Sequence, residues 1–423
     1  MSEATTSTTD GQISAPAARP AHRDGNVLRW VTAYTASMLG DTVFYLALSW
    51  AAVQRGTPAE AGIVTAVSAV PRALLMLGGG VVVDRLGPRR VVIGSDAVRC
   101  AAVLAVAVLL FATDPGLWLL ALLALVFGAV DALFLPAVGA LPARITAKDQ
   151  LARVQGMRGL AVRFAAVVGA PLGGLGVAVG GSAAAFAFAG LLIAVSVPLL
   201  VSVRIRALPR DDAPAAAAEV GTAWRDLRDG LRYIRRHRVL GPLMLVIALG
   251  DLGFVGPLNI GLTLLADERG WGASGMGWVL AGFGVGAGTA ALLLTVRGRV
   301  PHAGYVVAGA LVPGAVAIGA LAQAPALPVA VGTALLIGLL AGLSGALCGA
   351  LLQTQSAPGM LGRVTAVSGI VSLGIAPLSM PLSAAAIGVW GTGPVFAVSA
   401  AVCGLGGVVA LCAPGVRRAE LPE

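Results

Sequence analysis

Charge is scarce in this sequence. Only 12% of its 423 residues are Asp, Glu, Lys or Arg, 57% are hydrophobic, and the mean hydropathy is +0.89. A soluble domain carries about 25% charged residues, so this composition cannot supply an ordinary water-facing surface. It excludes a typical soluble protein and predicts one whose solvent is lipid.

Histidine and cysteine are also rare, with three and four residues. The histidines lie on separate polar segments, and no P-loop, metal-binding spacing or nucleophile–base pair is present. The sequence therefore predicts neither an enzyme nor a bound metal or cofactor. All four cysteines lie in apolar runs, where we expect them to pack as small hydrophobic residues: Cys100, Cys348, Cys403 and Cys412.

Long apolar runs are abundant instead. A helix crosses a bilayer with about 20 apolar residues, and continuous runs of this length favour helices over the short alternating strands of a barrel. The sequence therefore predicts an all-α integral membrane protein. We identify twelve spans, at 27–53, 61–83, 91–112, 117–141, 154–179, 183–203, 239–265, 274–296, 303–324, 327–352, 364–389 and 394–413.

Polar segments divide these spans into parts. Residues 1–26 are rich in Ser, Thr and Ala, lack the layout of a signal peptide, and are predicted to be a disordered tail. A polar linker at 204–238 separates six spans at 27–203 from six at 239–413. Residues 414–423 form a short C-terminal tail.

The basic residues predict the orientation, because they stay on the cytoplasmic side. Of 29 Lys and Arg, 23 fall on one side, four lie within spans, and the other side carries only Arg55 and Arg269. Both termini are therefore predicted to be cytoplasmic, in the inner cell membrane. The same bias explains the net charge of +9 without a nucleic-acid partner.

The linker contains a basic stretch, WRDLRDGLRYIRRHRVL, at 224–240. Its pattern is typical of an amphipathic helix, which would lie on the anionic inner leaflet of the membrane. A solvated connector between the two sets of spans is the alternative.

The two sets of spans are related by an internal repeat. At an offset of 210 residues, Gly40-Asp41 matches Gly250-Asp251, Arg153-Val154 matches Arg363-Val364, and Pro171-Leu172 matches Pro381-Leu382. Six spans per half give both halves the same orientation, so the halves are predicted to be parallel repeats.

The loop between spans two and three resembles a motif of the major facilitator superfamily, G-x-x-x-D-R-x-G followed by basic residues. The resemblance implies twelve helices in two pseudo-symmetric six-helix bundles. A proline, Pro88, replaces the first trailing basic residue. The matching residues are Gly80, Asp84, Arg85, Gly87, Arg89 and Arg90.

By this resemblance, the loop forms a cytoplasmic latch between the bundles. Asp84 would accept hydrogen bonds from the N-terminus of span eleven, near Gly362 and Arg363, where the helix dipole favours an anion. The contact would break during transport. The alternative is a basic turn that serves only the topology.

Span five resembles the glycine-rich motif of the antiporter branch, which in that family favours export. The motif ends G-P-x-x-G-G, and here the chain reads Gly169-Ala170-Pro171-Leu172-Gly173-Gly174, with the proline one place later. Small residues allow close helix packing, and a proline allows a bend. A generic tight-packing helix is the alternative.

Ionisable residues in the middle of spans are costly, so they are functional candidates. Three are aspartates, Asp41, Asp131 and Asp251, on spans one, four and seven, which the family resemblance places around a central cavity. Arg72 and Arg163 lie near the middle of spans two and five. Pairing of Asp41 or Asp131 with one of these arginines is expected. Arg158, nearer the cytoplasmic end, is a further candidate partner.

A buried carboxylate beside an arginine suits proton coupling, because alternating access changes both its solvation and its partner. Asp131 is the first candidate for the proton carrier and Asp41 the second. Asp251 could be a second proton site, a contact for a cationic substrate, or a residue facing cavity water. For Arg72 and Arg163, a structural ion pair is the alternative.

The remaining cavity candidates are uncharged aromatic and amide residues, and packing is the alternative role for each of them. A pocket with so few polar groups suits a bulky, mostly apolar ligand better than a sugar or an amino acid. The candidates are Tyr34, Tyr45, Phe134, Asn259, Gln353 and Gln355.

The segments GDTVFYLALSW and QTQSAPGMLGRV resemble the drug/proton antiporter branch that holds macrolide and siderophore exporters. The resemblance implies an exporter of hydrophobic or amphipathic drugs or secondary metabolites. It would work by proton antiport and alternating access, as a monomer without a cofactor, with the proton gradient as energy source. The alternatives are an exporter of an endogenous siderophore or lipid, and a membrane protein that does not transport.

Overall fold

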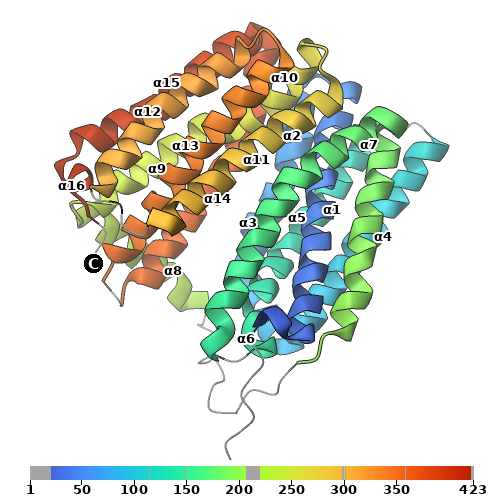
Figure 1. Ribbon diagram of the computed structural model, residues 1–423, viewed down its shortest axis with the longest axis horizontal. Helices are drawn as coiled ribbons and strands as arrows, with labels where there is room; N and C mark the ends of the chain where they lie inside the picture. The colour runs from blue at the N-terminus through green and yellow to red at the C-terminus, as the bar shows by residue number, and fades with distance from the viewer. Residues whose placement is uncertain are drawn as a thin grey trace, which may run out of the picture.

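The computed structural model describes residues 21–113, 115–146, 148–205, 220–297, 300, 302–357 and 359–420. All regular secondary structure in these residues is helical. Figure 1 shows the helices in two bundles that lie side by side, one from each half of the chain. The last described helix, α16 (Pro414–Arg417), lies at the far side of the second bundle.

The first bundle contains the N-terminal helices. A capped helix opens it, because the Asp24 side chain accepts a hydrogen bond of 2.8 Å from the backbone of Asn26. The elements are η1 (Ala21–Arg23), α1 (Gly25–Arg55), α2 (Pro58–Val67), α3 (Ala69–Leu86), α4 (Pro88–Ala112), α5 (Leu117–Ala140), α6 (Pro142–Ile145), η2 (Lys148–Gln150) and α7 (Leu151–Ser202).

The second bundle follows the linker helix α8 (Val220–Arg236). Its first long helix contains a π-helical turn, η4, which lies between α9 and α10. The elements are α9 (Leu240–Gly256), η4 (Pro257–Gly261), α10 (Leu262–Glu268), α11 (Gly272–Arg297), α12 (Ala303–Ala322), α13 (Leu327–Thr354), α14 (Leu361–Trp390), α15 (Thr392–Cys412) and α16 (Pro414–Arg417).

Ten helices in the described residues are long and apolar enough to cross a membrane. One of them, α7, has 52 residues, far more than one crossing needs. It consists of two helices, because the backbone at Gly180 and Gly181 is not helical, and the φ of +71° at Gly181 suits glycine. The second expected span is divided at Ser68 into α2 and α3, neither of which is among the ten. The count of twelve crossings stays a prediction.

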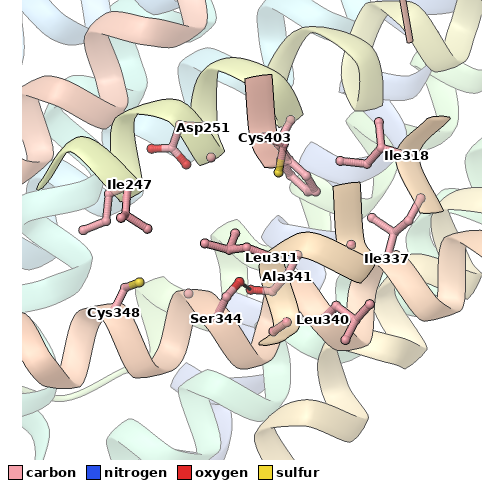
Figure 2. A pocket seen from close by; sticks show the side chains of 16 residues that line it. Ile247, Asp251, Leu311, Ile318, Ile337, Leu340, Ala341, Ser344, Cys348 and Cys403 are labelled. Carbon is pink, nitrogen blue, oxygen red and sulfur yellow. Dashed lines mark hydrogen bonds between the residues drawn. The ribbon is translucent and has the colours of Figure 1, made fainter. Parts of the chain in front are cut away.

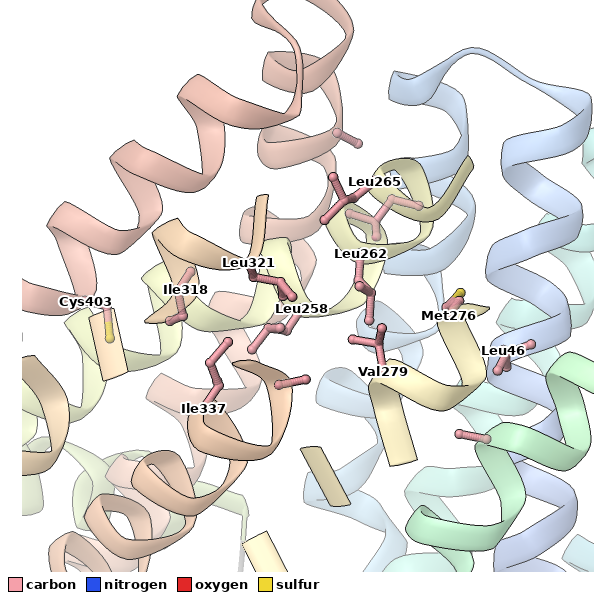
Figure 3. Close-up of a cluster of buried hydrophobic side chains, with 14 of the residues drawn as sticks. Leu46, Leu258, Leu262, Leu265, Met276, Val279, Ile318, Leu321, Ile337 and Cys403 are labelled. Atoms are coloured by element: carbon pink, nitrogen blue, oxygen red, sulfur yellow. The ribbon is translucent and has the colours of Figure 1, made fainter. Parts of the chain in front are cut away.

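The two bundles share a hydrophobic core. Figure 3 shows Leu46 of α1 beside Met276 of α11, with Val279 and Leu258 of the second bundle close by. Glycines bring the helix backbones together here, because Gly174 of α7 lies against Ala273. A side chain at that glycine would collide with the backbone of α11, so this contact depends on small residues.

Contacts between the bundles are concentrated at one end. There, α2 packs on the C-terminal part of α14, and Gln54 of α1 donates a hydrogen bond of 2.7 Å to Asp267 of α10. The bundles diverge toward the other end, which holds α6 and α8 (Figure 1). At that end, a Cβ atom added to Gly80, Gly87 or Gly362 would meet no atom within 4 Å.

Candidate functional site: a buried charge cluster beside a cavity between the bundles

A single arginine organises the buried charges of the first bundle. Arg99, in the middle of α4, is 0% exposed. Its Nη1 atom lies 2.7 Å from Oδ2 of Asp41 on α1 and 3.4 Å from Oδ1 of Asp131 on α5, and its Nη2 atom pairs with Asp96 one turn earlier on α4. Three carboxylates from three helices therefore converge on one guanidinium group.

The inner part of this charge cluster is closed to solvent. Asp96 is 0% exposed and accepts hydrogen bonds from Ser37 of α1, at 3.1 Å, and from Ser196 of α7. The guanidinium carbon of Arg99 also lies 4.0 Å from the ring centre of Phe134. These contacts hold the arginine in one position, because its rotamers are fixed by both charge and packing.

The outer part of the cluster is more accessible. The side chains of Asp41 and Asp131 are 15% and 11% exposed, and Oδ1 of Asp41 has no hydrogen-bond partner among the described residues. The Tyr45 hydroxyl donates a 3.0 Å hydrogen bond to Oδ2 of Asp131. Asp41 and Asp131 are therefore more accessible than Asp96.

A cavity of about 370 Å³ lies between the two bundles, next to the cluster. Tyr45 lines it and also contacts Asp131, so this side chain joins the cavity to the buried charges. Both halves contribute to the lining, with Arg72 from α3, Asn259 from η4 and Met276 from α11. The lining is mixed, with methionine and leucine beside hydroxyl and amide groups.

Arg72 and Arg163 do not pair with the aspartates as the sequence led us to expect. Arg72 lines the cavity, makes no ion pair with a described residue, and has a buried Nε atom without a partner. Arg163 is exposed on α7. The pairing expectation was wrong because Arg99, on span three, occupies the place between α1 and α5.

Asp96 and Arg99 are the site residues that sequence reasoning missed. They stand three residues apart in an apolar helix, and this spacing places both on one face. An oppositely charged pair at that spacing in a membrane helix could have identified the cluster. The guanidinium group of Arg99 lies at the centre of the cluster. No group of three or more His, Cys, Asp or Glu in the described residues could hold a metal ion.

The other expected cavity residues are dispersed. Asn259 lines the cavity, and its side-chain amide donates a 2.7 Å hydrogen bond to the Val255 carbonyl. Tyr34 is buried, stacked on Trp30 with ring centres 5.8 Å apart, and Arg158 lies 5.5 Å above it. Phe134 packs under Arg99. Gln353 and Gln355 lie at the end of α13, away from this cavity.

The predicted latch loop joins α3 to α4 at Gly87, whose φ of +84° is typical of glycine. The side chain of Asp84 lies outside the described part of the structure. Arg89 donates a hydrogen bond to the carbonyl of Val201 on α7, while Arg85 and Arg90 are exposed. The latch contact stays a prediction.

The first turn of α14 instead packs against the linker helix. A Cβ atom at Gly230 of α8 would lie 3.1 Å from the carbonyl oxygen of Arg363, so the two backbones are close. The backbone of Ala357 also donates a 3.3 Å hydrogen bond to the Tyr233 hydroxyl of α8. In this arrangement α8 packs beside the helix end that the predicted latch would use.

The glycine-rich motif of span five lies where α7 contacts α1 of its own bundle and α11 of the other bundle. Gly169 and Gly173 pack against Thr42 and Val43 of α1, and Gly174 packs against α11 of the other half. These close approaches need small residues, which supports the packing role of the motif. Nothing in them tests its expected role in export.

Asp251 lies apart from the charge cluster. It is on α9, and Ser372 of α14 donates a 2.7 Å hydrogen bond to its Oδ2 atom. It lines a different cavity, inside the second bundle (Figure 2).

Comparison with known proteins identifies the family. The model of the Major Facilitator Superfamily matches residues 30–376. Among curated relatives, the multidrug efflux pump Tap of Mycolicibacterium fortuitum is 26% identical over 406 residues, covering 90% of this chain and 94% of the relative. Tap of Mycobacterium tuberculosis is 26% identical over 403 residues, covering 90% and 92%.

Solved structures share the fold at low identity. An auto-inhibited peptide transporter of the POT family aligns with a TM-score of 0.70 at 14% identity, covering 94% of this chain and 98% of that one. A mutant of the nucleoside transporter NupG aligns with a TM-score of 0.69 at 12% identity, covering 92% and 100%. The expected all-α membrane fold is confirmed, and the chain belongs to the Major Facilitator Superfamily of transporters.

Proposed function

We propose that the protein exports small hydrophobic or amphipathic compounds, such as drugs or secondary metabolites, by proton antiport. The observation that carries this proposal is the cluster of three carboxylates around Arg99 beside the cavity between the bundles. Export as the direction is supported by the two mycobacterial relatives, both named multidrug efflux pumps.

The charge balance of the cluster favours proton binding. One guanidinium and three ionised carboxylates have a formal charge of −2. Buried charge without a partner is costly, so the uptake of a proton by one carboxylate stabilises the cluster. Asp131 is the first candidate, because it is partly exposed and is joined to the cavity through Tyr45. Asp41 is the second, and Asp96 is a structural anchor.

Substrate and proton would compete through Tyr45. A ligand that presses this side chain toward Asp131 strengthens the hydrogen bond of 3.0 Å that the carboxylate accepts. A carboxylate with a stronger donor releases its proton more readily, so substrate binding and proton release become linked. The proton gradient then supplies the energy, and no cofactor takes part.

Alternating access is supported by the unequal ends of the bundles. The predicted topology places the contact between Gln54 and Asp267 on the outer side and the diverging end in the cytoplasm. The arrangement would then be open to the cytoplasm, ready to take up cargo for export. In this proposal the protein lies in the inner cell membrane with both termini in the cytoplasm, and it functions as a monomer.

The basic helix α8 would rest near the anionic inner leaflet. Its arginines Arg225, Arg228, Arg232, Arg235 and Arg236 are exposed, while Ile234 is buried. Exposed basic residues on a docked helix attract anionic lipid headgroups.

The test of the proposed function uses a bacterial host stripped of its own efflux pumps. Wild type, Asp131→Asn and the control Asp149→Asn are expressed at equal membrane levels, and growth is compared across hydrophobic antibiotics and dyes. Wild type and the control are expected to protect the host, and Asp131→Asn is not. The control removes an exposed carboxylate that accepts a hydrogen bond from the neighbouring Gln150, outside the cluster.

Proton coupling is then measured in proteoliposomes with a pH-sensitive dye. Addition of an exported compound should release protons with wild type and not with Asp131→Asn. If Asp131→Asn keeps the response and Asp41→Asn loses it, the carrier is Asp41. If both variants keep the response, proton coupling through this cluster is wrong. If neither wild type nor the control variant protects the host in the growth test, drug export is rejected.

A further inference from the structure

The second bundle contains a cavity of its own, of about 170 Å³, between α9, α12, α13 and α15. It shares no lining residue with the cavity between the bundles. Figure 2 shows Ile247, Leu311 and Ile337 around the space, with Ser344 and Cys348 on the α13 side. Small residues on facing helices leave this volume open: Gly250, Ala310, Gly314, Ala341 and Gly345.

Asp251 is the only charged residue among the described residues that line this cavity. Its Oδ2 atom accepts the hydrogen bond from Ser372, and its Oδ1 atom accepts none from the described residues. No described Lys or Arg forms an ion pair with it. The first bundle differs, because Arg99 already neutralises part of its negative charge.

A lone carboxylate in an apolar membrane cavity lacks the partner that would offset its desolvation. A ligand cation can supply that partner, and the charge-assisted hydrogen bond to the free Oδ1 atom would be strong. The apolar walls accept the rest of the ligand. An apolar cavity of about 150 Å³ is large enough for benzene, so this space suits one ring or a short branched chain.

We propose that this cavity binds a lipophilic amine, or the amine-bearing limb of a larger compound. The ammonium group pairs with Asp251, and the ring or alkyl group fills the space between α9, α12 and α13. That the amine is transported cargo rests on the proposed export function. The binding itself does not depend on that function.

The test measures equilibrium binding to the full-length protein in detergent micelles, with no proton gradient. The probes are benzylamine, which is a cation at pH 7, and benzyl alcohol, which has a similar shape without the charge. Wild type is expected to bind benzylamine about tenfold more tightly than benzyl alcohol, as for a hydrogen bond to a charged group. Asp251→Asn should remove this preference and leave the binding of benzyl alcohol nearly unchanged.

A second variant tests the cavity rather than the charge. A Cβ atom at Gly345 would meet no atom within 4 Å, so Gly345→Leu is expected to fold and to fill the cavity, weakening the binding of both probes. Ala341→Val, in the same wall, is the substitute if Gly345→Leu does not elute as a folded monodisperse protein. Asp149→Asn, outside the cavity, should bind both probes as wild type does.

Three results would overturn the proposal. Equal affinity of wild type for the two probes would mean that Asp251 does not offer a negative charge to a ligand. Unchanged benzylamine affinity in Asp251→Asn would place the amine elsewhere, and so would unchanged affinity in the folded cavity-filling variant. Because no gradient is present, any of these results leaves proton antiport untouched, and a failure of the Asp131→Asn test leaves this binding untouched.

Discussion

Gly40-Asp41 in α1 and Gly250-Asp251 in α9 are equivalent in the internal repeat, 210 residues apart, and their surroundings differ. Asp41 lies 2.7 Å from Arg99 in a network of buried charges. Asp251 has a hydrogen bond from Ser372 and faces an apolar cavity. The same dipeptide therefore belongs to a charge network in one half and to an open pocket in the other.

The packing around the two glycines also differs, and Gly40 is the more tightly packed of the two. A Cβ atom at Gly40 would lie 2.6 Å from Cγ1 of Ile193 and 2.9 Å from the carbonyl oxygen of Ala189, because α1 packs tightly on α7. A Cβ atom at Gly250 would have its nearest neighbour, in Leu311, at 4.0 Å. The repeat places both dipeptides at equivalent positions on their helices, and the neighbouring helices determine the surroundings of each one.

Arg99→Met is expected to have the largest effect, because it removes the cation that the three carboxylates of the first bundle share. Loss of one partner of a buried ion pair costs about 3–5 kcal/mol of the free energy of unfolding. The variant should unfold in detergent far below the wild-type temperature, as measured by thermal unfolding. Arg163→Met, which removes an exposed arginine of α7, is the control. Equal stability of the two variants would mean that the cluster is not held by Arg99.

Gly40→Ala and Gly250→Ala test the difference in packing between the repeats. Gly40→Ala should lower the free energy of unfolding by about 1–3 kcal/mol, because a methyl group is forced into a filled contact. Gly250→Ala should change it by less than about 0.5 kcal/mol. Denaturant titration of the two purified variants gives the comparison directly. Similar losses in both would show that the repeats pack alike at this position.

The sequence predicted the parts of the fold that depend on one segment at a time. Apolar runs located the long helices, and the mid-span aspartates Asp41, Asp131 and Asp251 were found because a charge stands out in an apolar segment. Helix periodicity alone could have joined Asp96 to Arg99, since they lie three residues apart on α4. We instead expected Arg72 and Arg163 as partners, because both also lie mid-span.

The features that the sequence did not predict depend on which helices are neighbours. Nothing local indicates that α4 places Arg99 between α1 and α5, or that Ser196 of α7 reaches Asp96. The docking of α8 on the first turn of α14 is equally remote in sequence. The cavity around Asp251 is set by glycines on three helices, and single-sequence patterns do not show whether a glycine closes a contact or leaves a void.

Ser372→Ala is expected to have a smaller effect than Arg99→Met, and it tests the surroundings of Asp251 directly. It removes the donor to Asp251, and the net contribution of such a bond is about 0.5–1.5 kcal/mol, to be measured by denaturant titration. Ser344→Ala is the matched control, since Ser344 lines the same cavity and donates only to the carbonyl of Ala341, at 3.2 Å.

The size of the Ser372→Ala loss reports whether water reaches Asp251. In a wet cavity, water replaces the lost donor, and the loss stays near that of the control. In a dry cavity, the carboxylate is left without any donor, and the loss should approach that of Gly40→Ala. A dry cavity would strengthen the preference of Asp251 for an ammonium group, because a cation would then meet no competition from water. The contrast between the paired Asp41 and the unpaired Asp251 would be greatest in that case.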